Sequence, residues 1–188
     1  MTHAKLTQPS AGFHASWLES FQEWGTLDQD GSAAFLAARY DLDLREASHF
    51  AQWVDLLHQM AVASFRPPEG LANQTTLWIT EGTDYLGAAS LRHSLLNEYL
   101  KEVGGHIGYG IRPSARGKGL AKLALAGALE EARGMGLKRV MVTCKQPNVA
   151  SARTIEACGG ELEGVRPPES FSPELGVTEP IRRYWFHL

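Results

Sequence analysis

The sequence predicts an α/β (α+β) fold with a mixed, mostly antiparallel central sheet flanked by helices. Strand-like and helix-like segments alternate through the second half of the chain. Two β-rich segments, 75–82 and 85–95, are separated by a short polar turn, which is typical of an antiparallel hairpin. The 188 residues, of which 44% are hydrophobic, suit a single domain over 1–188 with one buried core, and no linker divides them.

The first half of the chain is expected to be mainly helical. Residues 4–8 suggest a short first strand. Aromatic residues at spacings of four and three predict a helix over 14–24. A second helix is predicted over 44–65, because the prolines of 66–70 cannot continue it.

The second half is expected to alternate between strands and helices. In order, the predicted elements are a strand at 104–113, a helix at 119–133, a strand at 138–145, a helix at 148–158, and strands at 159–165 and 182–188. Four glycines in 104–113 weaken a strand, so they indicate a bulge or the close approach of a ligand. A long proline-spaced loop, 166–180, precedes the last strand.

Composition excludes several classes of function. The net charge of −3 provides no basic field, so no nucleic-acid partner is expected. The two cysteines, Cys144 and Cys158, cannot form a metal box or a disulfide framework, and they favour a reducing compartment without a bound metal. The chain has no signal-like start and no run near the roughly 18 apolar residues that span a bilayer, so we expect a cytoplasmic protein without a membrane partner.

A cluster of cations surrounds a glycine turn before the 119–133 helix. Between Val103 and Leu129 there are four Lys or Arg and no Asp or Glu. These cations are Arg112, Arg116, Lys118 and Lys122. A helix N-terminus adds unpaired N–H groups and partial positive charge, and glycine lets the backbone approach a ligand closely. The turn therefore predicts an anion site.

Two well-known phosphate motifs do not fit this turn. A Walker loop needs Ser or Thr after its Gly-Lys pair, where Gly119 stands here. A dinucleotide fingerprint needs Gly or Ala where Lys122 stands. The class of other nucleotide-binding proteins is therefore disfavoured. The alternative that the two glycines only begin a helix leaves the excess of cations around them unexplained.

The pattern Arg116-x-x-Gly119-x-Ala121 resembles the acetyl-coenzyme A motif of the GNAT superfamily of N-acetyltransferases. The resemblance implies that backbone N–H groups of 116–121 hold the pyrophosphate of acetyl-coenzyme A, a co-substrate, with Lys118 and Lys122 as further phosphate partners. The cofactor-binding residues that it implies are Ile111, Arg116, Gly117, Lys118, Gly119, Leu120, Ala121, Asn148 and Ser151.

A second stretch also resembles the family. Asn148-x-x-Ser151 opens a helix that is followed by two glycines, as in the family's second signature. Asn148 is a good N-cap, and by resemblance it also contacts the pantetheine arm, so both roles can hold. The order of elements matches the family along nearly the whole chain, and two stretches resemble a subgroup of its bacterial members. The implied activity is direct transfer of an acetyl group to a small-molecule or peptidyl amine.

The catalytic groups are less clear from the sequence. His106 is the first choice for the base because its unperturbed pKa lies near 6.5, with Tyr109 as the other titratable group on the strand, although a structural His106 is equally compatible. By resemblance, a backbone N–H near Ile111, splayed by a bulge, stabilises the thioester oxygen. Ile155 occupies the place of the family's usual Tyr acid, so Cys158, Tyr184 or water would have to replace it.

Three further interpretations stay open. A polar cluster follows the hairpin and either projects over the acceptor side or forms an exposed loop; it comprises Arg92, His93, Asn97 and Glu98. An acidic loop would favour a cationic amine; it carries Glu169, Glu174 and Glu179. The aromatic last strand could pair with a second copy at a sheet edge to give a homodimer. The alternative to an enzyme is a non-catalytic acyl-coenzyme A sensor on the same fold.

Overall fold

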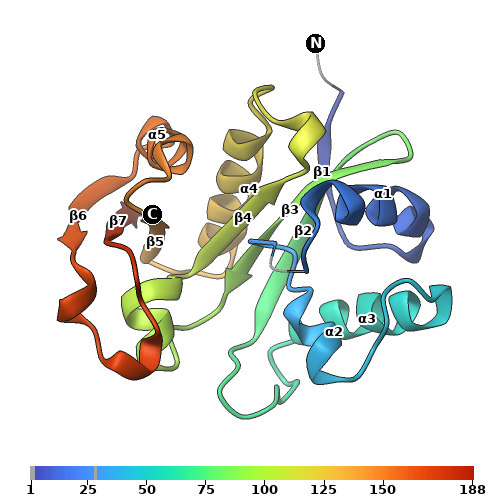
Figure 1. Ribbon diagram of the computed structural model, residues 1–188, viewed down its shortest axis with the longest axis horizontal. Helices are drawn as coiled ribbons and strands as arrows, with labels where there is room; N and C mark the ends of the chain where they lie inside the picture. The colour runs from blue at the N-terminus through green and yellow to red at the C-terminus, as the bar shows by residue number, and fades with distance from the viewer. Residues whose placement is uncertain (1–2, 28) are drawn as a thin grey trace.

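A computed structural model describes residues 3–27 and 29–188. All seven strands lie in one sheet of order β1-β2-β3-β4-β5-β7-β6 (Figure 1). The strands are β1 (Lys5–Thr7), β2 (Gln74–Glu81), β3 (Asp84–Arg92), β4 (Ile107–Ile111), β5 (Arg139–Lys145), β6 (Glu161–Arg166) and β7 (Ile181–His187). The α-helices are α1 (His14–Trp24), α2 (Phe35–Arg39), α3 (Ala47–Met60), α4 (Leu120–Gly134) and α5 (Val149–Ala157). Only the β4–β5 pair is parallel, which confirms the mixed, mostly antiparallel sheet.

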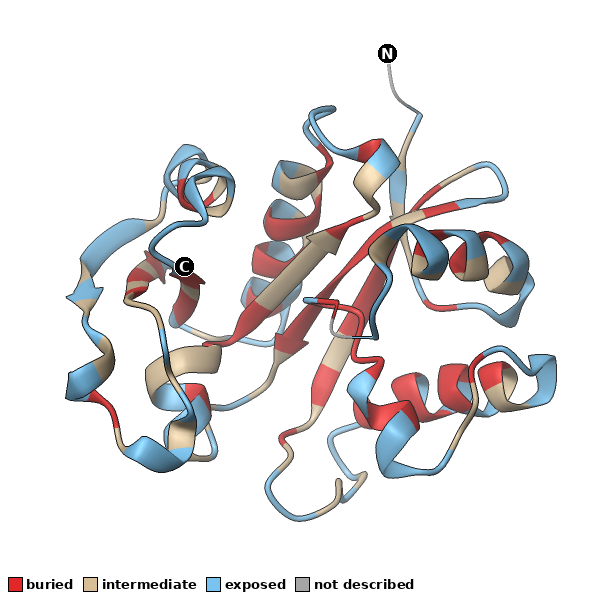
Figure 2. Ribbon diagram, in the orientation of Figure 1, coloured by how far each residue is buried: buried red, intermediate tan, exposed pale blue. Residues whose placement is uncertain are grey.

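Helices cover both faces of the sheet, and a separate apolar core lies under each face. On one face α1 and α3 pack an aromatic cluster onto β2, in which the rings of Trp17 and Trp53 lie 5.5 Å apart and those of Phe50 and Trp78 6.0 Å apart. On the other face α4 and α5 pack small and branched side chains on β3, β4 and β5. Figure 2 shows both cores as buried segments on either side of the central strands. Burial of these faces fixes the strands that carry the site.

The glycines of β4 have a different cause from the one that the sequence suggested. The β3–β4 register runs without a shift from Gly87↔Ile111 to Leu91↔Ile107, so the bulge expected in this strand is absent from that pairing. A Cβ added at Gly110 would lie 2.5 Å from the carbonyl oxygen of Asp30. The close approach is therefore made by the chain's own loop and not by a ligand.

The parallel pair β4–β5 diverges almost at once. Its register contains the single pair Ile107↔Val142, whereas β5 and β7 pair along seven residues. In β4 the even-numbered residues bond to β3, because the flanking bonds from Arg92 N–H to the His106 oxygen and from Arg112 N–H to the Leu86 oxygen, both 2.8 Å, fix the alternation of the register. By alternation, the N–H groups of Tyr109 and Ile111 turn toward the side from which β5 has moved away. This divergence supplies the splayed N–H groups that a bulge was expected to supply.

Several boundaries differ from the predictions. The sequence analysis missed α2, and the predicted helix 44–65 is shorter, because α3 ends at Met60 and a turn precedes the prolines. The final strand is not an edge, since β7 lies between β5 and β6, so the proposed pairing of this strand with a second copy is wrong. Within the described ranges, none of the helices combines the length and apolar character needed to cross a membrane.

Candidate active site

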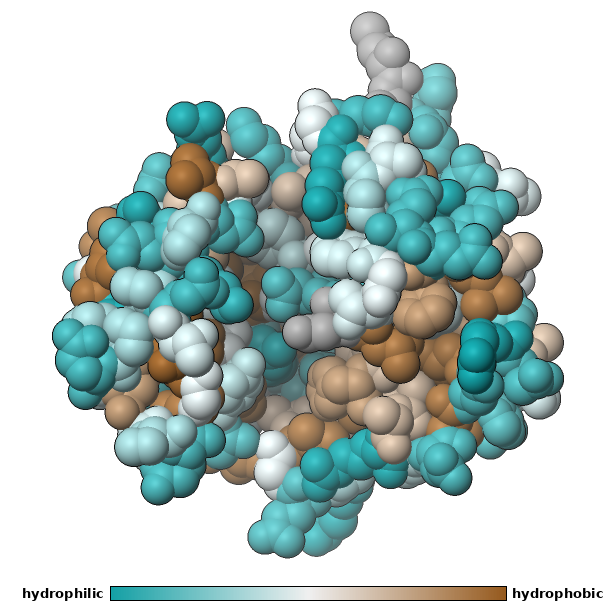
Figure 3. Space-filling view, viewed as in Figure 1, coloured by the Kyte–Doolittle hydropathy of each residue, from teal (hydrophilic) through white to brown (hydrophobic). Residues whose placement is uncertain are grey.

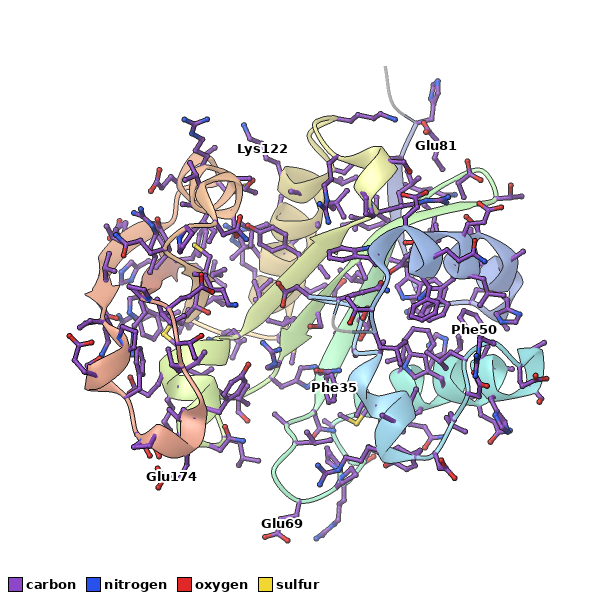
Figure 4. The ribbon with its side chains drawn as sticks, in the orientation of Figure 1. Phe35, Phe50, Glu69, Glu81, Lys122 and Glu174 are labelled. Carbon is purple, nitrogen blue, oxygen red and sulfur yellow. The ribbon has the colours of Figure 1, made fainter. Side chains whose placement is uncertain are left out.

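A cavity of about 520 Å³ lies where β4, the glycine turn and the start of α5 converge. We call it the main cavity. Its lining is Trp24, Asp30, Tyr109, Gly110, Ile111, Ala115, Arg116, Gly117, Gly119, Leu120, Ala121, Lys122, Asn148, Ala150, Ser151 and Thr154. In Figure 4 the side chain of Lys122 projects from the first turns of α4 on the side of α5. The cavity thus faces the gap that the divergence of β4 and β5 opens.

The turn before α4 exposes a run of backbone donors. Gly117 and Gly119 have φ angles of 77° and 80°, in the left-handed region that favours glycine. The amides of Lys122 and Leu123 both bond to the Gly119 oxygen, so the helix pattern begins only there. Among residues 3–27 and 29–188, none accepts a hydrogen bond from the backbone N–H groups of 117–121. These donors and the positive end of α4 make an anion site.

The four cations around the turn have different roles. Arg112 turns away to α1, where it pairs with Glu23 at 2.7 Å and with Glu19 at 3.1 Å. Arg112 is therefore held by two carboxylates of α1, and it does not line the main cavity. Arg116 donates from Nε to the Ile111 oxygen at 3.1 Å and lies 4.7 Å over the ring of Trp24. This bond ties the turn to the end of β4.

The two lysines differ in position. Lys122 is exposed and lines the main cavity, where it supplies a mobile positive charge beside the unpaired amides. Lys118 is also exposed, but it lines a neighbouring cavity with Arg112 instead. The predicted contact of Lys118 with the same ligand therefore depends on its flexible side chain reaching across the turn.

The start of α5 and the adjacent strand β4 bring three polar groups to the other wall, Asn148 and Ser151 from α5 and Tyr109 from β4. Asn148 Oδ1 accepts from the Ser151 N–H at 3.1 Å, so Asn148 caps the helix while it also lines the cavity. The Tyr109 hydroxyl lies 2.9 Å from Ser151 Oγ and donates to the Ser151 carbonyl at 3.3 Å. Burial raises the pKa of Tyr109 to about 12, so its hydroxyl keeps its proton at neutral pH.

His106 lies outside all the cavities described here. Its Nδ1 accepts a 2.9 Å bond from the Met141 N–H, and its side chain is 8% exposed. Burial, and then the charge of Arg92, lower the pKa of His106, so the ring stays neutral. The bond to Met141 gives His106 a structural role next to Ile107↔Val142, the single residue pair that joins β4 and β5.

The expected substitutes for the missing acid also lie elsewhere. Ile155 is fully buried in the core beneath α5. The Tyr184 hydroxyl donates to Glu156 at 2.9 Å and does not line the main cavity. Burial raises the pKa of the Cys158 thiol, and Cys158 does not line the main cavity either. Tyr109 is the phenol that reaches the site.

The structure brings together the predicted residues Ile111, Arg116, Gly117, Gly119, Leu120, Ala121, Asn148, Ser151 and Tyr109. It does not bring His106 to them. The sequence analysis missed Trp24 and Asp30, because both come from the α1 side and no local pattern joins them to the glycine turn. None of the three acids of the acidic loop lines the main cavity, and Glu179 pairs with Lys145 at 2.8 Å.

Comparisons with known proteins agree with this geometry. Residues 21–161 match the family model described as an acetyltransferase (GNAT) domain. The microcin C7 self-immunity acetyltransferase MccE, solved with acetyl-CoA and AMP, superposes with a TM-score of 0.67 at 18% identity, covering 98% of this chain and 92% of that one. The ribosomal L7/L12 alpha-N-protein acetyltransferase RimL, solved with coenzyme A, gives 0.65 at 17% identity, covering 100% and 96%.

A curated relative matches over a shorter stretch. The coproporphyrin III ferrochelatase of Symbiobacterium thermophilum is 28% identical over 106 residues, which are 55% of this chain. The match spans only 30% of that relative's length. The family model, by contrast, covers most of this chain.

The chain therefore belongs to the GNAT family of acetyltransferases, the enzymes that move an acetyl group from acetyl-coenzyme A to an amine. Its sheet and helices form the fold of that family.

Proposed function

We propose that this protein is an N-acetyltransferase that binds acetyl-coenzyme A in the main cavity and acetylates a small-molecule or peptidyl amine. The observation that carries the proposal is the run of unpaired amides at 117–121 beside Lys122, at the mouth of the β4–β5 gap. We also propose that one domain, 1–188, does this work, which the single continuous sheet supports. The free thiols of Cys144 and Cys158 support a reducing, cytoplasmic setting.

Different residues of the main cavity would bind different parts of the co-substrate. The amides of 117–121 and the Lys122 ammonium hold the diphosphate, while Arg116 fixes the turn against Ile111 and Trp24. Asn148 and Ser151 line the wall where the pantetheine arm would lie. No Cβ stands at Gly117 or Gly119, and an ideal Cβ at either position would meet nothing within 4 Å, so the ligand can approach the backbone closely.

Acetyl-coenzyme A supplies the thioester carbon that the amine nitrogen attacks. A C–N bond forms, the C–S bond breaks, the amine loses a proton and the departing sulfur gains one. The splayed N–H groups of Tyr109 and Ile111 face the gap and stabilise the charge that develops on the thioester oxygen.

Tyr109 acts as a hydrogen-bond donor to the departing sulfur. Its pKa of about 12 stands above the roughly 8.5 of a thiol, so complete proton transfer would be uphill by about 5 kcal/mol. A hydrogen bond that Tyr109 donates without transferring its proton avoids this free-energy cost. Water then supplies the proton.

Asp30 is the group we propose for drawing the amine proton away, directly or through water. Among the described residues it is the one acid that lines the main cavity. It also lines two neighbouring cavities, one of about 190 Å³ in the β4–β5 gap and one of about 320 Å³ near α3. The structural bond of His106 to Met141 argues against His106 in this role.

The test is turnover. Thiol release from acetyl-coenzyme A is followed with a panel of small and N-terminal peptidyl amines, and the acetylated product is identified by mass spectrometry. The proposal expects amine-dependent release that falls at least tenfold in Asp30→Asn, without loss of acetyl-coenzyme A affinity. Tight binding of acetyl-coenzyme A with no amine-dependent release across the panel would instead favour a non-catalytic sensor.

A further inference from the structure

Two smaller cavities lie next to the main cavity, in the direction of the α3 side of the sheet, and neighbouring cavities share lining residues. The first, about 190 Å³, lies in the β4–β5 gap and shares Asp30, Tyr109, Asn148 and Ser151 with the main cavity. The second, about 320 Å³, lies between the start of β2, the end of β3 and α3, and shares Asp30, Arg92 and Tyr99 with the first. We call this second one the α3-side cavity. The shared residues place the α3-side cavity next to the β4–β5 gap, where an acceptor amine would have to enter to reach the thioester.

The α3-side cavity is small and largely apolar on one wall. That wall is formed by Ala33, Phe35, Met60, Leu71, Ala72 and Leu100. Figure 3 shows the central hollow of this face with apolar surface along one side of it, and Figure 4 shows Phe35 near its rim. Since a water takes about 30 Å³, a volume of 320 Å³ suits a compact molecule with a short apolar body.

The opposite wall carries a cation without a carboxylate partner. Arg92 Nη1 donates to the carbonyls of Gly104 and Gly105 at 2.9 and 3.1 Å. No described acid lies within ion-pair distance of this guanidinium, although the charge of Asp30 acts on it from farther away. Nη2 points toward β4, 3.8 Å from where a Cβ of Gly108 would stand. A partly buried cation of this kind is stabilised by an anion.

Buried donors stand beside Arg92 on the same face of the sheet. The register pairs Gln74 with Arg92 and Thr76 with Ser90, so all four side chains point to the α3 side. Gln74 lines the cavity and is 2% exposed, and its Nε2 has no hydrogen-bond partner among the described residues. Thr76 Oγ1, also buried, lacks a partner too. Buried polar groups are almost always paired, so this side of the cavity lacks an acceptor.

We propose that the α3-side cavity binds the acceptor as a small amine that also carries a carboxylate, an apolar α-amino acid or a close analogue. The carboxylate accepts from Arg92 and Gln74, with Ser90 beside them, and the apolar body packs on Met60, Leu71 and their neighbours. The amine is then directed past Asp30 into the β4–β5 gap. This assignment rests on the proposed acetyl transfer, which it deepens, and it replaces the cationic acceptor that the acidic loop suggested.

The test compares amines that differ only in the carboxylate. Wild-type protein is assayed with L-phenylalanine against phenethylamine, L-leucine against isoamylamine, and spermidine as the cationic arm. Because each hydrogen bond to a charged group contributes about 1.5–3 kcal/mol, we expect kcat/KM to favour the amino acids by at least tenfold. Equal rates within each pair, or fastest turnover of spermidine, would overturn the assignment while acetyl transfer itself stands.

Two variants test whether Gln74 and Arg92 bind the carboxylate of the acceptor. Gln74→Met keeps the size of the side chain and removes a buried unpaired donor, so it should lower kcat/KM for L-phenylalanine several-fold, leave phenethylamine unchanged and not lower Tm. Arg92→Met should erase the preference. If loss of the bonds to Gly104 and Gly105 unfolds that variant, Gln74→Met decides: an unchanged L-phenylalanine to phenethylamine ratio contradicts the proposal.

A binding measurement separates the two proposals. Calorimetry with 3-phenylpropanoate, which has the carboxylate and no amine, should give heat with wild type and several-fold weaker binding with Gln74→Met. If this acid binds as expected while no amine is acetylated, the proposed function is wrong and the carboxylate site stands. If it does not bind while amines are acetylated, the carboxylate site is wrong.

Discussion

Replacement of Tyr109 by Phe removes one hydroxyl at the point where the main cavity meets the β4–β5 gap. The structural loss is a neutral hydrogen bond to Ser151 at 2.9 Å, about 1 kcal/mol, or a fall in Tm of about 2–4 °C for a chain of this size. The catalytic loss is larger, because the proposed bond is made to a sulfur that becomes an anion. Such a bond is worth about 1.5–3 kcal/mol, so kcat should fall about 10- to 150-fold.

The assay is steady-state thiol release with saturating amine, with the KM for acetyl-coenzyme A and Tm measured on the same preparations. Ser151→Ala is the matched control, since it removes a partner of the hydroxyl while the hydroxyl itself remains; it should lower kcat only a few-fold. A Tyr109→Phe enzyme with kcat within twofold of wild type would refute the reasoning about the leaving group.

Three further variants and conditions test other parts of the account. Lys122→Glu should weaken acetyl-coenzyme A binding about tenfold at physiological salt and more at low salt. Lys138→Glu, an equal charge change in the turn between α4 and β5, should not, and equal effects would contradict a local phosphate contact. Burial raises the pKa of Tyr109 and Tyr184 to about 12, so the folded protein keeps protons that the unfolded chain loses. Stability should be complete below about pH 10 and fall by about 2–3 kcal/mol for Tyr109 by pH 12, with a smaller contribution from Tyr184. The fall should be shallower in Tyr184→Phe, and an unchanged slope in that variant would count against this cause. His106→Ala should lower Tm, because the buried Met141 N–H loses its acceptor at a cost of about 1–3 kcal/mol. It should leave the pH profile of kcat/KM unaltered, whereas loss of the acidic limb, where a general base becomes protonated, would restore His106 as the base.

The sequence predicts the fold and the anion turn well because both depend on local signals. Strand and helix periods, prolines and the Arg116–Ala121 pattern are contiguous in the chain, and the structure brings nearly all of the residues they imply to one cavity. The order of the last strands is not local. The position of β7 between β5 and β6 follows from long-range packing, which no segment of the sequence encodes by itself.

The roles of individual charged and small residues were harder to predict for the same reason. Arg112 belongs to the cationic stretch in sequence, but α1 brings Glu19 and Glu23 to it in space. In the sequence Gly110 indicates a bulge or a ligand, whereas in space the loop at Asp30 lies against it. Gln74 carried no signal at all, because only the register with Arg92 shows that its amide is buried without a partner.

The central claim is that backbone amides of 117–121 bind the diphosphate of acetyl-coenzyme A. Two-dimensional ¹⁵N–¹H NMR during titration measures this directly, with S-acetylpantetheine, which lacks the diphosphate, as the matched ligand. We predict saturable shifts of the 117–121 amides with acetyl-coenzyme A and none there with S-acetylpantetheine. Saturable binding of acetyl-coenzyme A that leaves these amides unshifted would contradict the account.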